Sequence, residues 1–283
     1  MRSNEFPFKF DFGITEQNLQ GGQLMGINFH DNENRNTYTT READMTWKQT
    51  IRNLVPMDQV TNALDIGCGG GIYSKALVDM GIPYVTGVDF SKAILEGARE
   101  NCKNYHNITF VYGNAFDTGL DSSSFQLILE RALIHHLDDL ISCFKEVYRL
   151  LEHKGMFIVQ DRTPEDCLLK GDNSHIRGYF FEVFPRLAEQ EMKRRHDRSH
   201  VIEKLKEVGF TEIEEIKFWE TRKVYKTKEQ LLHDLRNRTG RSILHELNDN
   251  ELDLLINHID QSLTIDTDIV ERDRWTIWKA IKS

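Results

Sequence analysis

Glycines and acidic residues gather in one stretch of the first half of the chain, with the composition of a site for a charged ligand. The stretch ALDIGCGGG, residues 63–71, closes a short apolar run with Asp65 and continues through Gly67, Cys68 and Gly69. Glycine tolerates positive φ angles and lets a ligand approach the backbone closely. A helical pattern follows directly, and the free N–H groups and positive dipole end of such a helix favour an anionic group. The stretch therefore predicts a loop that binds a pyrophosphate or a carboxylate.

A second acidic residue narrows the chemistry. Asp89, in the stretch GVDFS, ends the next predicted strand. A carboxylate there can accept hydrogen bonds from both hydroxyls of a ribose, so it fits a ligand that contains adenosine. Phe90 follows directly and is placed to lie against an adenine. The alternative is that Asp89 only caps the next helix, a role for which Ser91 is better suited.

The spacing of the glycines separates two classes of nucleotide-binding protein. A dinucleotide-binding fingerprint places its third glycine five residues after the first. That position is Ile72, and the chain carries Gly71 one place earlier. The spacing therefore disfavours a nicotinamide-dependent oxidoreductase, which stays an alternative.

Alternating patterns predict the elements that position these residues. From residue 62 onward, short apolar runs alternate with segments of helical periodicity. Predicted strands cover 63–66, 84–90, 108–114, 125–131 and 156–162, with helices between them. This order indicates an α/β fold with a mostly parallel, doubly wound sheet and helices on both faces. Ligands of such sheets bind beyond the carboxyl ends of the strands. Four polar residues fall at that edge: Asp65, Asp89, Asn114 and Glu130.

The second half of the chain changes character. Helical insertions are predicted at about 165–208, including a continuous helical stretch from 175, and at about 227–262. A sixth strand is predicted at 211–225 and a seventh at 269–282. Two pairs have the spacing of a helix-capping box: Thr227 with Gln230, and Asn248 with Glu251.

Five stretches together resemble the class I S-adenosylmethionine-dependent methyltransferases. They are ALDIGCGGG, VTGVDFS, VYGNAFD, FQLILERALIHHL and VYRLLEHKGMFIVQD. The resemblance covers residues 60–165 and is nearest to the branch with an LHHL element after the fourth strand. It implies a seven-stranded sheet whose last strand is antiparallel, and S-adenosylmethionine as the cofactor, with S-adenosylhomocysteine as the product.

The resemblance also implies roles for individual residues. The backbone of Gly67, Cys68 and Gly69 would approach the methionine part of the cofactor, while Asp65 orders the loop. Asp89 would bind the ribose hydroxyls, and Phe90 would border the adenine. Further cofactor contacts are implied for Asn114, Ala115, Glu130 and Arg131. Two of these positions depart from the family pattern, which often has Asp at Asn114 and a small residue near the Glu130–Arg131 pair. The side chains of Glu130 and Arg131 are expected to bind each other, the substrate, or the polar groups of the cofactor's methionine.

The start of the chain is expected to cover the cofactor. Residues 1–55 are predicted to form an arm and a helix, and residues 56–283 the methyltransferase domain. Tyr38 is placed to cover the methionine chain, and Arg41 to pair with its carboxylate. The alternative is a plain surface start to the helix.

Methyl transfer requires the acceptor, the methyl group and the sulfur to be held in line, and some acceptors also need a base. Candidate bases at the strand ends are Glu130, His135, His136 and Asp161. His135 is the first choice because it matches the family's HH element. The alternative is a packing or gating role for this histidine.

Charge and composition limit the partners. The formal net charge of −9 argues against a nucleic-acid partner, and the one dense basic run, residues 193–198, is interpreted as a solvated helix face. An enclosed cluster of aromatic residues at 178–184 with Trp219 would suit either a core or a small-molecule pocket. Four scattered cysteines suggest a reducing cytoplasm and have no metal-binding spacing. No transmembrane segment is expected. We therefore expect a small-molecule methyltransferase, a monomer or homodimer. A protein or tRNA methyltransferase and a non-catalytic cofactor-binding protein stay as alternatives.

Overall fold

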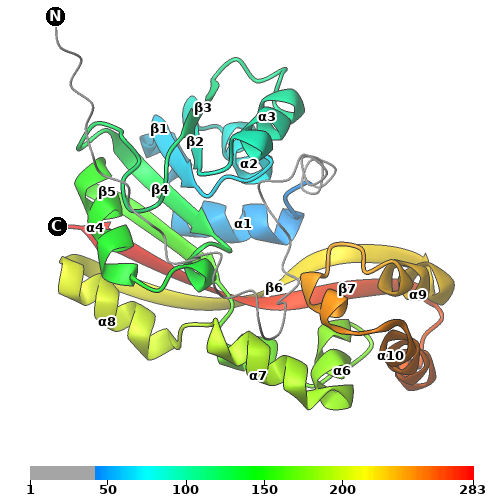
Figure 1. Cartoon of the computed structure of the whole chain (residues 1–283). Helices are drawn as coiled ribbons and strands as arrows, with labels where there is room; N and C mark the ends of the chain where they lie inside the picture. The colour runs from blue at the N-terminus through cyan, green and yellow to red at the C-terminus, as the bar shows by residue number, and fades with distance from the viewer. Residues whose placement is uncertain (1–41) are drawn as a thin grey trace, which may run out of the picture.

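A computed structural model describes residues 42–283 of the chain (Figure 1). Seven strands form one sheet in the order β3-β2-β1-β4-β5-β7-β6. Strands β1 to β5 run parallel, and β7 is antiparallel to both of its neighbours. The predicted doubly wound sheet with an antiparallel last strand is confirmed.

The observed strands lie close to the predicted residue ranges. They are β1 (Asn62–Ile66), β2 (Tyr84–Asp89), β3 (Ile108–Tyr112), β4 (Phe125–Arg131), β5 (Leu151–Asp161), β6 (Phe210–Thr227) and β7 (Thr267–Lys282). The fifth strand begins earlier than predicted because its pairing with β4 continues across an irregularity. Lys154 has a φ angle of +64° there, and the regular register resumes at Met156.

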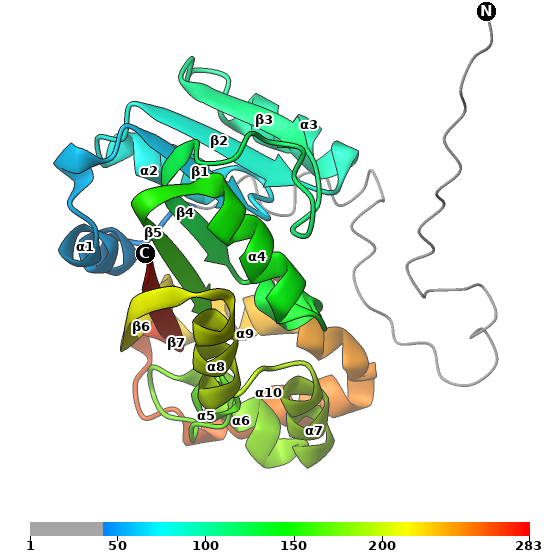
Figure 2. The ribbon, with the colours of Figure 1, turned by 90° about the vertical axis from the view of Figure 1, so that its left-hand side faces the viewer.

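Helices cover both faces of the sheet (Figure 2). The α-helices in the first half are α1 (Met45–Leu54), α2 (Ile72–Asp79), α3 (Lys92–Asn101) and α4 (Leu140–Leu150). Those in the second half are α5 (Pro164–Cys167), α6 (Ile176–Val183), α7 (Pro185–Lys193), α8 (Arg198–Val208), α9 (Lys228–Arg236) and α10 (Asp249–Ser262). The short 3-10 helices within residues 42–283 are η3 (Met57–Gln59), η4 (Ile134–His136) and η5 (Ser242–Glu246).

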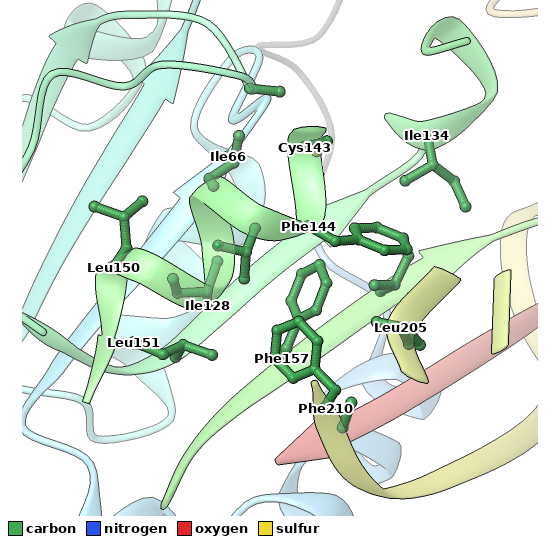
Figure 3. Close-up of a cluster of buried hydrophobic side chains, with 14 of the residues drawn as sticks. Ile66, Ile128, Ile134, Cys143, Phe144, Leu150, Leu151, Phe157, Leu205 and Phe210 are labelled. Atoms are coloured by element: carbon green, nitrogen blue, oxygen red, sulfur yellow. The ribbon is translucent and has the colours of Figure 1, made fainter. Parts of the chain in front are cut away.

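Alternation along the strands divides the core into two layers. Leu64 and Ile66 of β1 pack with α4 and α8 on one face, whereas Ala63 packs with α1 and α2 on the other. Figure 3 shows the first layer, where Phe144 of α4 meets Phe157 of β5 at 5.4 Å between ring centroids. These two layers fix the strand ends at which the polar residues lie.

A third core lies beyond the end of β5 and forms a cap. β7 pairs with β5 only as far as Thr276, and residues 267–275 pair with β6 alone. This two-stranded ribbon extends away from the sheet to α9 and α10 (Figure 1). We call this ribbon, together with α5, α6, α7, α9 and α10, the cap. Its interior is apolar, and the helices predicted as insertions supply most of that interior.

Two details of the predicted helices are wrong. The continuous helical stretch from residue 175 is broken, because Pro185 starts a new helix and Phe184 before it is not helical. Thr227 makes no capping hydrogen bond, since Gln230 accepts from the N–H of Lys226 instead. The second capping box is confirmed: the Asn248 side chain accepts from the N–H of Glu251, and Glu251 accepts in return from the N–H of Asn248. No helix within residues 42–283 has the length and apolar character needed to cross a membrane.

Candidate functional site

The glycine loop connects β1 to α2 at the carboxyl edge of the sheet. Gly67, Gly69 and Gly71 have φ angles of +72°, +53° and +75°, a region that residues with side chains rarely adopt. The N–H groups of Gly67 and Cys68 donate to the carbonyl oxygen of Val88 at 2.8 and 3.0 Å. A Cβ built on Gly69 would meet no atom within 4 Å, so this part of the loop faces open space. The loop thus has the room that a ligand close to the backbone requires.

Asp65 lies beneath the loop and is 2% exposed. It accepts a hydrogen bond of 2.6 Å from the Ser74 hydroxyl, which ties the end of β1 to α2. Burial, with a contribution from the negative charge of Asp89, raises the pKa of Asp65 to about 6. A positively charged ligand group at the loop would stabilise its ionised form. The contact with Ser74 is the arrangement that the predicted loop-ordering role requires.

Asp89 lies one strand away and links directly to the loop. Its Oδ2 accepts from the N–H of Gly69 at 3.0 Å, and its Oδ1 accepts from the N–H of Ser91 at 2.9 Å. The Ser91 side chain caps α3 by accepting from the N–H of Ile94, so Ser91 is the helix cap, as the sequence suggests. A carboxylate has about four lone-pair positions, so such a group can hold a loop and still accept from hydroxyls. Phe90 is 47% exposed beside it.

Asn114 and Ala115 follow β3 at the same edge. The Asn114 side-chain oxygen accepts from the N–H groups of Phe116 and Asp117, both at 2.8 Å. This oxygen therefore forms the turn, and the side chain offers its NH2 donors to a ligand. Ala115 is buried against the core.

Glu130 and Arg131 do not pair with each other. Successive strand residues point to opposite faces. Glu130 faces α4, where its Oε1 accepts a hydrogen bond of 3.1 Å from the Cys143 thiol. Arg131 faces the other side, where its Nη2 lies 2.8 Å from Glu220 of β6. Of the pairings expected for these two residues, the mutual one is wrong.

Arg131 is held in an aromatic and polar setting. Its guanidinium lies over the rings of Tyr73 and Trp275, at 4.1 and 4.5 Å from their centroids. The Tyr73 hydroxyl also donates to Glu220 at 3.2 Å. The Nε of Arg131 has no hydrogen-bond partner among the described residues. Because Tyr73 lies in α2, two residues after Gly71, the Arg131 guanidinium lies on the side of the sheet that α2 covers.

Changing Glu130 to glutamine is expected to alter the pH dependence of stability. Glu130 is fully buried, and burial raises its pKa from the ordinary 4.5 to about 8. Because the folded-state pKa lies above the unfolded one, its stabilisation is complete at acidic pH and is lost as the pH rises toward 8. Relative to Glu130→Gln, the wild type should lose about 3 kcal/mol of unfolding free energy between pH 5.5 and 8. Urea unfolding at both pH values measures this difference.

A matched control uses an exposed glutamate. Glu189→Gln on α7 should leave the difference between the two pH values as in the wild type. Parallel pH curves for the wild type and Glu130→Gln would show that Glu130 is ionised when the chain is folded.

His135 and Asp161 form a buried pair at the ends of β4 and β5. The Nδ1 of His135 lies 2.8 Å from Oδ2 of Asp161, whose carboxylate also accepts from the backbone N–H of His135. With Nδ1 donating its proton to the carboxylate, Nε2 carries the lone pair. Burial lowers the pKa of His135 despite the neighbouring carboxylate. The imidazole is therefore a neutral base at neutral pH.

Asp161 is ionised in this pair. Burial alone would raise its pKa, but the adjacent His135 and Arg195 hold the pKa of its carboxyl well below the usual range. Arg195 Nη1 lies 2.5 Å from Asp161 Oδ1. This fixed negative charge orients the histidine and can stabilise an imidazolium.

The basic run at 193–198 is not wholly a solvated face. Arg194 and Arg195 turn inward to Glu191, a fully buried residue of α7. Arg177 of α6 binds the same carboxylate at 2.9 Å. Lys193, Asp197 and Arg198 are exposed as expected, and Arg198 pairs with Glu215 at the surface. The solvated-face interpretation is therefore wrong for the middle of this run.

Sequence reasoning missed this buried network. Glu191 precedes Arg194 and Arg195 by three and four residues, the spacing at which charged side chains pair along a helix surface. That signal was available, but it predicts exposed pairs. Burial of Glu191 depends on its contacts with Arg177 and Cys167, from other segments of the chain.

Several other residues have structural roles. Phe180 and Phe181 are buried in the apolar interior of the cap, so the core interpretation of the aromatic cluster holds for them. Trp219 is 39% exposed. All four cysteines are free and buried. Within the described part of the chain, no group of His, Cys, Asp and Glu side chains is arranged to hold a metal ion. Tyr38 and Arg41 lie outside the described residues.

Comparisons with known proteins agree with this geometry. Residues 64–159 match the family model described as a methyltransferase domain. The match spans the glycine loop, Asp89, the His135 segment and nearly all of β5. The resemblance to the class I methyltransferases that the sequence suggests is confirmed.

Two curated relatives are demethylmenaquinone methyltransferases. The enzyme of Listeria welshimeri is 26% identical over 154 residues, which are 53% of this chain and 64% of that enzyme. The enzyme of Staphylococcus epidermidis is 27% identical over 125 residues, covering 44% of this chain and 52% of that enzyme. The chain therefore spans less than two thirds of the length of these relatives.

Solved structures share the fold over most of the chain. A protein of Anabaena variabilis, assigned as a methyltransferase of an antibiotic biosynthesis pathway, has a TM-score of 0.65 at 20% identity. That match covers 84% of this chain and 98% of the other. Phosphoethanolamine N-methyltransferase 2 of Haemonchus contortus, solved with S-adenosyl-L-methionine, has a TM-score of 0.57 at 17% identity. It covers 90% of this chain and 60% of the other.

Proposed function

We propose that this chain is an S-adenosylmethionine-dependent methyltransferase whose acceptor is a small organic molecule. One observation carries the proposal: open space at Gly69, in a loop of positive φ, lies beside the buried carboxylate of Asp89. A backbone bare of side chains next to a ribose-binding acid fits an adenosyl ligand with an amino-acid tail. The methyltransferase-domain match over residues 64–159 supports this reading of the site.

The residues present fit the cofactor. Its adenosine would be held by Asp89, Phe90, Asn114 and Ala115. Its amino-acid end would lie against the glycine loop, where Asp65 offers a carboxyl to the ammonium group and Arg131 a guanidinium to the carboxylate. The Glu130 side chain faces α4, so it would not contact the cofactor and would affect the site only by packing beneath the end of β4. When bound, the cofactor supplies a methyl group on a positively charged sulfur.

The chain's own contribution is positioning and proton removal. In-line displacement requires the acceptor to be fixed with water excluded. His135 Nε2 takes a proton from the acceptor, while Asp161 keeps the imidazole oriented and stabilises its charged form. Both side chains are largely buried, with 10% and 2% exposure, which suits this role.

The acceptor is proposed to be small for two reasons. Arg194 and Arg195, two of the four Lys and Arg residues in the basic strip that a protein or tRNA substrate would favour, are bound to the buried Glu191. The Listeria and Staphylococcus relatives are named for methylation of demethylmenaquinone, a small molecule. Against an oxidoreductase, Ile72 opens α2 where the dinucleotide fingerprint needs glycine. We further propose that residues 1–55 act as an arm over the cofactor. A cytoplasmic location and a monomeric or homodimeric state stay predictions.

Calorimetry tests the cofactor assignment directly. We expect saturable binding of S-adenosylmethionine and S-adenosylhomocysteine, and none of NAD. A methylation screen of small molecules, read out by formation of S-adenosylhomocysteine, then identifies the acceptor. Binding of NAD without binding of S-adenosylhomocysteine would replace the proposal with a nicotinamide-dependent function.

The Asp89→Ala variant is expected to bind S-adenosylhomocysteine about 10- to 100-fold more weakly, because charge-assisted hydrogen bonds to the ribose are lost. Calorimetry on the folded variant measures the change. Asp253→Ala, at an exposed position of α10, is the matched control and should bind as the wild type does. Equal affinities for Asp89→Ala and the control would remove Asp89 from the ribose site.

A further inference from the structure

Four arginines gather where the cap meets the sheet. Arg162 follows β5, Arg177 lies in α6, and Arg194 and Arg195 follow α7. We call them the arginine cluster. The side chains of Arg162, Arg177 and Arg195 are 13%, 11% and 5% exposed. A guanidinium stays charged in a protein interior, so each of these groups requires compensation.

The acids beside the cluster do not balance it. Glu191 binds Arg177, Arg194 and Arg195 together. Asp161 binds Arg195 and His135, and Asp273 lies 3.3 Å from Arg162. Within residues 42–283, four cations thus face three carboxylates. The surplus cation is Arg194, whose side chain is 37% exposed, so the extra positive charge lies at the solvent edge of the cluster.

The next ion network along the ribbon has the same surplus. Arg222 and Arg241 both bind Glu271 of β7, at 2.9 and 2.7 Å. Arg222 also contributes to the charge around Asp273. Glu271 is therefore already shared by two cations and does not neutralise the cluster.

The cluster also carries unused hydrogen-bond donors. The Nε groups of Arg162, Arg177 and Arg194 are buried and have no hydrogen-bond partner among the described residues. A buried donor without a partner costs about 1 to 3 kcal/mol, so such groups are rarely left unpaired without a reason. Burial and the neighbouring charges of Arg177 and Arg195 lower the pKa of Arg162, as expected where like charges crowd. An anion with several acceptor oxygens would satisfy these donors.

The cluster adjoins the candidate base. Arg195 and His135 bind the same carboxylate, that of Asp161, at 2.5 and 2.8 Å. A group held by the arginines would therefore place the rest of its molecule near His135. The cofactor's own carboxylate does not need the cluster, because Arg131 packs on Tyr73 of α2, the helix that follows the glycine loop.

We propose that the arginine cluster is the subsite that binds an acidic group, a carboxylate or a phosphate, of the methyl acceptor. The proposal rests on the proposed function, since it names the chemical class of the substrate. Guanidinium groups suit such anions because their N–H donors match two oxygens at once.

The first test uses the whole chain saturated with S-adenosylhomocysteine, so that the glycine loop is filled. Calorimetric titration with sodium phosphate, and separately with sodium acetate, is compared with sodium chloride at equal ionic strength. We expect saturable binding of phosphate or acetate, and the stronger of the two identifies the acidic group. Titrations of both anions that match chloride would overturn the proposal.

Variants locate the binding. Arg194→Gln, at the most exposed member of the cluster, should weaken anion binding at least 10-fold without unfolding the chain. Arg186→Gln, in α7, removes the same charge from a surface pair with Glu251 of α10 and should leave binding unchanged. Equal weakening by both variants would place the anion elsewhere and overturn the proposal. As a second readout, acidic acceptors should be preferred over their amides, and Arg194→Gln should reduce this preference.

The two proposals fail separately. If S-adenosylhomocysteine binds and neither anion does, only the subsite is wrong. If S-adenosylhomocysteine does not bind, the methyltransferase proposal is wrong, and with it the acceptor role of the cluster.

Discussion

His135→Gln is expected to lower kcat for methyl transfer about 100-fold, while the affinity for S-adenosylhomocysteine stays within twofold of the wild type. A positioned general base contributes on the order of 10²- to 10⁴-fold, and His135 is the neutral, oriented imidazole at the site. The measurement uses the acceptor returned by the small-molecule screen. His106→Gln is the matched control, because His106 is exposed and precedes β3, at the opposite edge of the sheet from His135.

The pH profile gives this prediction a second readout. Because burial lowers the pKa of His135 below its usual 6.5, the neutral form prevails at pH 6.5 and above. Wild-type kcat should hold its plateau down to that pH and fall only under more acidic conditions. His135→Gln should lose this acidic limb. An unchanged kcat in His135→Gln would instead assign the residue to packing or gating.

Glu191→Gln is expected to destabilise the fold by about 3 to 5 kcal/mol. The change leaves three buried or partly buried guanidinium groups without their shared carboxylate, and a buried charge that has lost its partner costs this much. The surrounding arginines already hold the pKa of Glu191 far below its usual range against the opposing effect of burial. Urea unfolding at pH 7 measures the loss.

A second glutamate–arginine pair supplies the comparison. Glu251 pairs with Arg186 at 2.8 Å near the surface, so Glu251→Gln should cost less than about 1 kcal/mol. If both variants lose the same small amount, the network around Glu191 is too well solvated to matter for stability. A large loss only in Glu191→Gln supports its role as the anchor between α6 and α7.

The sequence predicts the loop and the strand ends well because their signals are local. Gly67 and Gly69 indicate a turn, and Asp65 and Asp89 each end an apolar run. Parallel strands bring such ends to one edge without any knowledge of side-chain packing. The prediction of Ser91 as the helix cap succeeds for the same reason.

Contacts between distant segments could not be predicted in this way. Arg131 pairs with Glu220, which lies 89 residues away in the sequence, and Asp161 pairs with Arg195, which lies 34 residues away. Neither pair has a spacing that distinguishes it from other charged residues. The predicted helix 175–208 is broken at Pro185, which has no backbone N–H to continue the preceding helix. The helical periodicity on both sides of Pro185 favoured one continuous helix, so the break was not predicted.

The ribbon of β6 and β7 ties the cap to the sheet by continuous backbone rather than by a linker. Its ladder runs from Phe210 paired with Lys282 to Thr227 paired with Thr267, and a register shift interrupts it between Thr221 and Lys223. Movement of the cap would therefore be a torsion of two paired strands about that irregularity, without a swivelling joint. Excision of the cap would also cut β7, which pairs with β5, and β6, which pairs with β7. Transplanting this cap onto another protein of this fold thus means exchanging two of the seven strands along with it.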